Sequence, residues 1–103
     1  MIKIICKRKI EPAYFEEIFK LYRDTVAPHS RREPGNISYE LYQDIDDPYT
    51  LILIEEWESE ACETYHQQTS HYKKLAEAMK LYKIRSAEIH FLREVAHGDP
   101  SAK

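Results

Sequence analysis

Apolar residues recur along the first third of the chain with two different spacings, and each spacing predicts one kind of element. Weak alternation over residues 2–10 predicts a strand, whose shared apolar side consists of Ile2, Ile4, Cys6 and Ile10. Glu11-Pro12 then opens a helix, because proline suits the first helical turn. The apolar stripe of this helix consists of Phe15, Ile18, Phe19, Tyr22 and Val26. We expect Pro28 to end the regular helix or to kink it.

The middle of the chain has the pattern of a turn followed by a hairpin. Glu33-Pro34-Gly35-Asn36 is typical of a turn, with a glycine that is free to take positive φ. Residues 37–45 alternate as a strand does, and Thr50 to Trp57 forms the next strand. The segment between them, with Asp46-Asp47-Pro48, predicts the connecting loop.

The last third predicts a broken helix and a final strand. Ser59 can cap a helix over about residues 60–68. Thr69-Ser70 interrupts the helical pattern, and a second helical stretch follows. Residues 84–94 then predict a last strand.

The predicted order is β-α-β-β-α-β, which indicates an α+β fold of the ferredoxin-like type, with helices on one face of an antiparallel sheet. The run Leu51-Ile52-Leu53-Ile54 is apolar toward both faces of this sheet. An uncovered apolar sheet face is typical of an interface. We therefore expect a homodimer in which two sheets pack face to face around a two-fold axis.

Composition narrows the class of protein. The 103 residues suffice for one domain, expected at residues 1–95, with residues 96–103 as a polar, mobile tail. A net charge of −3 without a basic stripe argues against nucleic acid as a partner. No apolar stretch approaches the length of a membrane span, and the charged start is not typical of a signal peptide. Reduced thiols at Cys6 and Cys62 are expected, and with them a cytoplasmic location.

Three segments resemble the antibiotic biosynthesis monooxygenase family, in the right order and spacing. They are REPGNISYELY at residues 32–42, EEWESE at 55–60 and HQQTSHY at 66–72, and the resemblance covers residues 2–94. It implies a dimeric α/β barrel and a reaction on a small phenol or quinol that uses O₂ and no cofactor. Because one fold carries several reactions, the resemblance is less specific for chemistry than for architecture.

Branches of this family differ in their site residues. The haem-degrading branch has a tryptophan and a histidine ten residues apart on the second helical layer, where this chain looks to have His66 and Ala76. That branch also has an asparagine on strand one, which this chain lacks. The isomerase branch, which acts on a small sugar phosphate, shares residues 66–72, but it looks to have a histidine where this chain has Ala27. The quinol monooxygenase branch is the nearest.

The candidate chemistry rests on two histidines and three aromatic residues. Oxidation of a phenol without metal or flavin needs a base for the hydroxyl group, and His71 and His66 are the catalytic candidates, with a structural role as the alternative for each. They are five residues apart, so an unbroken helix would separate them, whereas the break at Thr69-Ser70 could unite them. Lacking an obvious third ligand, they do not predict a metal site. Trp57, Tyr65 and Tyr72 are the expected substrate-binding residues, although a tryptophan at the position of Trp57 more often belongs to the core.

Three hypotheses follow for the function. The first is a cofactor-independent monooxygenase acting on a small aromatic substrate. The second is an isomerase that moves protons on a small carbonyl compound or sugar phosphate. The third is a non-catalytic, ligand-binding dimeric module, which a cavity too small for a six-membered ring would favour.

Overall fold

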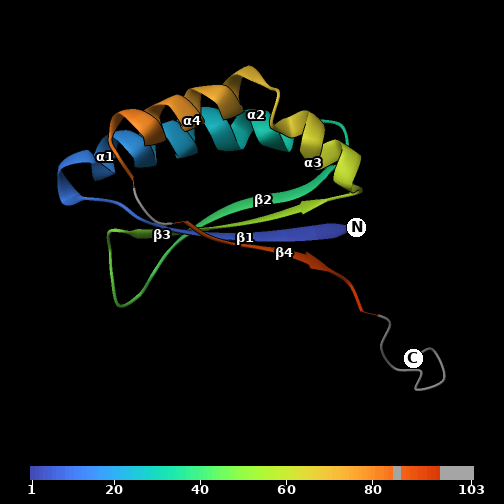
Figure 1. The fold of residues 1–103 in the computed structure, drawn as a ribbon, viewed down its shortest axis with the longest axis horizontal. Coiled ribbons are helices and arrows are strands. Elements are labelled where there is room, and N and C mark those ends of the chain that lie inside the picture. The colour runs from blue at the N-terminus through green and yellow to red at the C-terminus, as the bar shows by residue number, and fades with distance from the viewer. Residues whose placement is uncertain (85–86, 96–103) are drawn as a thin grey trace.

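The computed structural model describes residues 1–84 and 87–95 and arranges them as a helical layer on a four-stranded sheet (Figure 1). The elements are β1 (Ile2–Lys9), α1 (Pro12–Leu21), the π-helical η1 (Tyr22–Val26), α2 (Ala27–Arg31), β2 (Asn36–Gln43), β3 (Thr50–Trp57), α3 (Glu60–His66), α4 (Ser70–Leu81) and β4 (Ala87–Arg93). This is the α+β, ferredoxin-like β-α-β-β-α-β order that the sequence predicts. The expected mobile tail, residues 96–103, lies outside the described residues.

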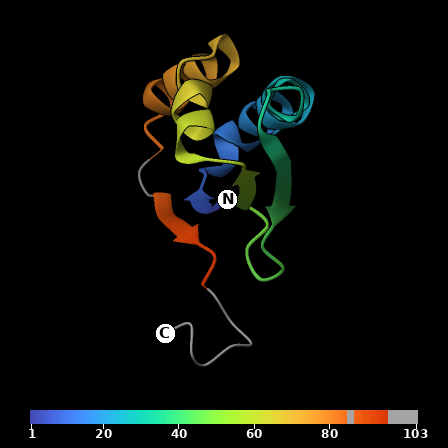
Figure 2. The ribbon, with the colours of Figure 1, turned by 90° about the vertical axis from the view of Figure 1, so that its right-hand side faces the viewer.

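All neighbouring strands in the sheet are antiparallel, and their order is β2-β3-β1-β4. The helices cover one face of it, as the end-on view in Figure 2 shows. Alternate residues of the central strands β1 and β3 therefore enter the core beneath the helices. From the sheet these are chiefly Ile4, Cys6, Leu51 and Leu53, all buried.

The first helical segment runs further than its proline suggests. After α1 the backbone widens into the π-helical η1, and Pro28 lies in the first turn of α2, which continues to Arg31. A proline is accepted in a first helical turn because its missing N–H costs no helical hydrogen bond there. The expectation that Pro28 ends the helix is therefore wrong, although regular α-helical hydrogen bonding does give way to η1 just before this proline. The longer path brings the following turn, with Glu33, over the sheet.

The sheet face opposite the helices carries its own apolar residues. Ile5 pairs with Ile54 across β1 and β3, and Tyr42 pairs with Ile52 across β2 and β3. Leu92 of β4 pairs with Lys3 on the same side, and Leu92 and Tyr42 are 41% and 52% exposed. We call this set, Ile5, Tyr42, Ile52, Ile54 and Leu92, the open face. The expected homodimer would cover it, and that expectation stays a prediction.

Two further features bear on the class of protein. Within the described part of the chain, no helix combines the length and the apolar character that a membrane crossing requires. Cys6 is free and buried in the core, and Cys62 is free and partly exposed on α3.

Candidate active site

The break between α3 and α4 brings the two candidate histidines together. The Thr69 side chain caps α4 by accepting from the backbone N–H of Tyr72, and its hydroxyl donates to the carbonyl of His66 at 2.7 Å. Each histidine thus lies at a helix end beside the break, one in the last turn of α3 and one in the first turn of α4. Their ring centroids are 5.7 Å apart.

Glu33 joins the two rings through one carboxylate oxygen. Its Oε2 lies 2.6 Å from Nδ1 of His66 and 2.8 Å from Nε2 of His71. The three side chains are only 7%, 2% and 10% exposed, respectively. Since a carboxylate only accepts hydrogen bonds, each of these two ring nitrogens donates its proton to it.

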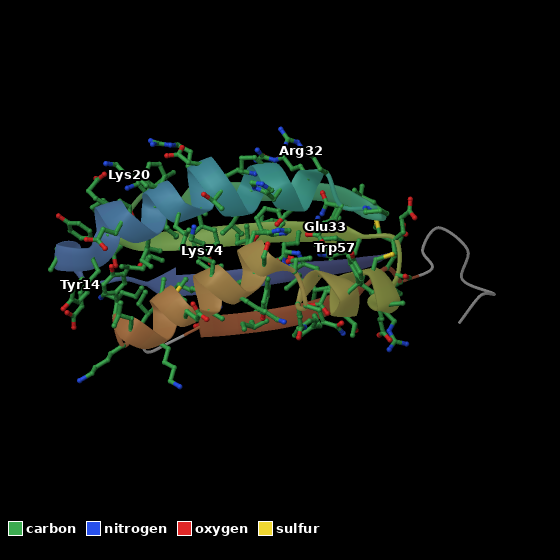
Figure 3. All side chains as sticks on the ribbon, turned by 90° about the horizontal axis from the view of Figure 1, so that it is seen from above. Tyr14, Lys20, Arg32, Glu33, Trp57 and Lys74 are labelled. Atoms are coloured by element: carbon green, nitrogen blue, oxygen red, sulfur yellow. The ribbon has the colours of Figure 1, made fainter. Side chains whose placement is uncertain are left out.

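The backbone of the turn after Glu33 packs closely against α3, and this contact holds Glu33 in place. Gly35, two residues later, has φ +84°, and its carbonyl accepts from the N–H of Glu58 at 2.8 Å. A side-chain carbon at this glycine would lie 2.4 Å from Sγ of Cys62, so only glycine fits against α3. Figure 3, which looks onto the helices, labels Glu33 and Trp57, and both of these side chains contact His66.

The bond to Glu33 sets the tautomer of His66. With the proton on Nδ1, the Nε2 atom carries the lone pair and lies 4.0 Å from Oε1 of Glu55. Burial lowers the pKa of His66, although the bond to Glu33 opposes this shift. A neutral imidazole with a free Nε2 and an orienting carboxylate is the arrangement of a general base.

Glu55 is a buried carboxyl group next to this base. It is 7% exposed, and Nε1 of Trp57 donates to its Oε1 at 2.9 Å. Burial raises the pKa of Glu55 to about 7; the Trp57 bond opposes the shift, and the charges of Glu63 and Glu33 add to it. A carboxyl group with such a pKa can take up or release a proton near neutral pH.

A cavity of about 70 Å³ lies between the sheet and the helices beside these groups. Its polar lining consists of Arg8, Tyr22, Tyr39, Glu55, Glu63, His66, Gln67 and Tyr72, and its apolar lining includes Ile4, Leu53, Leu75 and Phe91. Benzene is known to occupy an apolar cavity of about 150 Å³. A six-membered ring would therefore need lining side chains to move, and Phe91, 62% exposed, is placed to do so.

The five residues predicted for the site occupy three different places. His66 and Tyr72 line the cavity. Trp57 is fully buried, packs on His66 at 4.7 Å between ring centroids, and reaches the site through Glu55. His71 and Tyr65 line a separate outer hollow of about 370 Å³.

Sequence reasoning missed Glu33 and Glu55. Glu55 had a usable signal, because it occupies a buried position in the alternating series Leu51, Leu53, Glu55 and Trp57 of β3. A charge in the apolar register of a strand is typical of a functional or paired group. Glu33 had no such local signal, because it lies 33 residues from one of its partners and 38 from the other.

The cluster of Glu33, His66 and His71 also bears on the question of a metal site. Ligand atoms of Glu33, His66 and His71 lie within 4.8 Å of one another, so the structure supplies the third group that the sequence did not reveal. Two imidazoles and a carboxylate can hold Zn²⁺ or Fe²⁺. Separations of 2.6 and 2.8 Å are hydrogen-bond distances, however, and a metal would displace a proton from each ring. We therefore treat the cluster as hydrogen bonded.

Comparisons with known proteins agree with this fold. The model of the family described as "Antibiotic biosynthesis monooxygenase" matches residues 1–78. "Putative monooxygenase YcnE" of Bacillus subtilis (strain 168) is 32% identical over 73 residues, which are 71% of this chain and 76% of that protein. "Uncharacterized protein sll1783" of Synechocystis sp. is 33% identical over 81 residues, 79% of this chain; the chain spans about half (54%) of its length. A crystal structure of an antibiotic biosynthesis monooxygenase superposes with a TM-score of 0.85 at 27% identity, covering 93% of this chain and 100% of the other.

Proposed function

The chain belongs to the antibiotic biosynthesis monooxygenase family, and from this premise we propose that it is a cofactor-independent monooxygenase that oxidises a small phenolic or quinol-type substrate with O₂. The observation that carries the proposal is His66, whose Nδ1 is held by Glu33 while its Nε2 lies toward Glu55 and the cavity. A base is the group that such a reaction needs from the protein.

The proposed first step is removal of a hydroxyl proton by Nε2 of His66. The resulting phenolate is a far better reductant than the phenol and can pass an electron to O₂ directly. With a hydroquinone, one oxygen atom enters the ring and the other leaves as water, so that the products are a hydroxyquinone and H₂O. The substrate supplies all four electrons. No electron acceptor other than O₂ is required.

Glu55 and the aromatic residues have supporting roles in this proposal. A Glu55 carboxyl with a pKa of about 7 can return a proton to the reduced oxygen. Tyr72 lines the cavity and packs edge-on against His66 at 5.2 Å. Trp57 acts through Glu55. Tyr65, in the outer hollow, contacts a substrate only if that substrate extends to His71.

A role of His71 follows from the same hydrogen bonds. Through Glu33 it is linked to His66 and also borders the outer hollow, so we propose that it orients the base rather than contacting the ring. A positioning residue of this kind affects the rate through another side chain. The expected homodimer belongs to this proposal, because a partner sheet would cover the open face and stiffen β3, the strand that carries both Glu55 and Trp57.

Oxygen uptake with menadiol as the hydroquinone tests the proposal. We expect uptake above autoxidation, a loss of about 10²–10⁴-fold in His66→Ala, and a smaller loss in His71→Ala. Lys20→Ala, a change of an exposed side chain on α1, away from both the cavity and the open face, serves as the control. A rate that survives replacement of both His66 and His71 would contradict the mechanism. With ¹⁸O₂, one labelled atom should appear in the quinone.

The small cavity supports two alternatives. A volume of about 70 Å³, below that of a six-membered ring, is the outcome that favours a non-catalytic, ligand-binding module. It also suits a small carbonyl compound, and two proton-transfer groups, His66 and Glu55, lie 4.0 Å apart at the cavity wall. Such a pair could isomerise a carbonyl compound by moving a proton between neighbouring carbons. Turnover that is unchanged without oxygen would select this isomerase function over the monooxygenase.

A further inference from the structure

Arg8 is a cation on the covered side of the sheet. It follows Ile4 and Cys6 at alternate positions of β1 and lines the cavity with them. Lys7, its neighbour in sequence, is exposed on the other side of the strand. A guanidinium group beneath the helices has lost much of its water and must be compensated there.

The compensation of the guanidinium group is incomplete among the described residues, because its polar contacts are with the Tyr22 hydroxyl and the Cys6 thiol and not with a carboxylate. Its Nε is buried and has no hydrogen-bond partner, and no carboxylate of residues 1–84 and 87–95 lies within 4.0 Å of it. Tyr22 is near enough for the arginine to act on its hydroxyl, whose pKa burial nonetheless raises. An unpaired donor beside a cavity is expected to meet its acceptor in a ligand.

We propose that Arg8 is an anion-binding residue of this cavity and that it holds a phenolate or carboxylate oxygen of the ligand. The inference deepens the proposed function and rests on it for the class of ligand, a phenol or quinol that presents a hydroxyl group to the base and carries a second, anionic oxygen group. Arginine suits this role since it stays charged and presents several donors to one oxygen group.

The strand register places Arg8 and the base at different ends of the cavity. Ile4 pairs with Glu55, whereas Arg8 pairs with Leu51, four residues further along β1 or roughly 13 Å of strand. The long arginine side chain shortens this separation, and its charge lowers the pKa of Glu55, against the larger effect of burial. A ligand that spans the cavity would thus have its neutral hydroxyl at His66 and its anionic oxygen toward Arg8.

Binding of 4-nitrophenol tests Arg8 without any turnover, because its phenolate absorbs visible light and reports its own protonation. We expect the bound compound to ionise about one pH unit or more below the free one, as a close opposite charge produces. Arg8→Met should abolish this shift and weaken phenolate binding at least tenfold. Arg8→Lys, which keeps the charge but not the planar donors, should bind the phenolate with an affinity between those of the wild type and Arg8→Met. Lys7→Met, which removes the same charge from the other side of β1, should behave as the wild type does.

Each outcome decides the inference. Unchanged binding in Arg8→Met, an equal loss in Lys7→Met, or no binding of the phenolate by the wild type would overturn it. If Arg8→Met does not fold, a phenolate affinity in a folded Arg8→Gln variant equal to that of the wild type overturns it as well. Phenolate binding that depends on Arg8 in a protein without oxygen uptake would leave the anion site standing and remove the oxidation. Oxygen uptake with the same kcat/KM in wild type and Arg8→Met would leave the oxidation standing and remove the anion site.

Discussion

Replacing Glu33 by glutamine removes the charge at the centre of the candidate site and keeps the shape of the side chain. In the native protein one carboxylate oxygen accepts from both His66 and His71, at 2.6 and 2.8 Å. The glutamine carbonyl oxygen can accept from both rings in place of Oε2, but it carries no charge, and the NH₂ group then lies at the Oε1 position, which is buried and has no hydrogen-bond partner. Both hydrogen bonds therefore lose the contribution of the charge, and the tautomer of His66 with a free Nε2 is held less firmly.

The size of the expected stability loss follows from the burial of Glu33, because its side chain is 7% exposed and solvent scarcely screens its charge. A hydrogen bond to a charged group contributes about 1.5–3 kcal/mol. We expect the free energy of unfolding of Glu33→Gln to fall by about 2–3 kcal/mol, and Tm by roughly 10–20 °C for a domain of this size. Oxygen uptake should fall with the population of the correct tautomer.

Two measurements check this expectation. Urea unfolding gives the stability change, and long-range ¹H–¹⁵N correlation spectra of the histidine rings report which nitrogen carries the proton. Glu58→Gln, at an exposed carboxylate three residues after Glu55, is the matched control. If Glu33→Gln keeps both the stability and the Nδ1–H tautomer of His66, the bridge between the histidines has been misread.

Three more changes test other parts of the structure. Because the pKa of Glu55 is raised from 4.5 to about 7, its ionisation opposes folding: the penalty is absent below pH 4.5, grows as pH rises to 7, and reaches about 3 kcal/mol above it. In urea unfolding from pH 4 to 8, the free energy of unfolding of Glu55→Gln should rise relative to that of the wild type by up to this amount. Glu56→Gln, on the other side of β3, should show no such rise. Gly35→Ala should lower the free energy of unfolding by about 1–3 kcal/mol, because of the positive φ of this residue and the clash of the new side chain with Cys62. In a double-mutant cycle, Cys62→Ala should restore part of this loss, and fully additive effects of the two changes would speak against the contact. Light scattering should give a dimer mass for the wild type and a monomer mass for Ile54→Lys on the open face, and a wild-type monomer at micromolar concentration would refute the predicted interface.

Much of the fold could be predicted from short stretches of sequence. The segment from Thr50 to Trp57, with its apolar run at residues 51–54, was predicted as a strand, and the structure places β3 at Thr50–Trp57. The break at Thr69-Ser70 was also visible, and the structure shows its cause in the capping hydroxyl of Thr69. That the helix continues past Pro28 was not predicted, because the widened turn of η1 that lets the helix resume has no clear signature in the residues themselves.

The histidines at 66 and 71 were visible as candidates from their residue type and their place beside a helix break. That both meet one carboxylate could not be read from the chain, because Glu33 lies more than thirty residues away and reaches them only through the turn at Gly35. The raised pKa of Glu55 and the unpartnered Nε of Arg8 likewise arise from burial under helices that other segments provide. Periodicity and capping act between residues a few positions apart, so the sequence by itself determined the elements and their order. Hydrogen-bond partners, loss of water and the field at a buried charge depend on which distant segments pack together, and these only the tertiary structure decided.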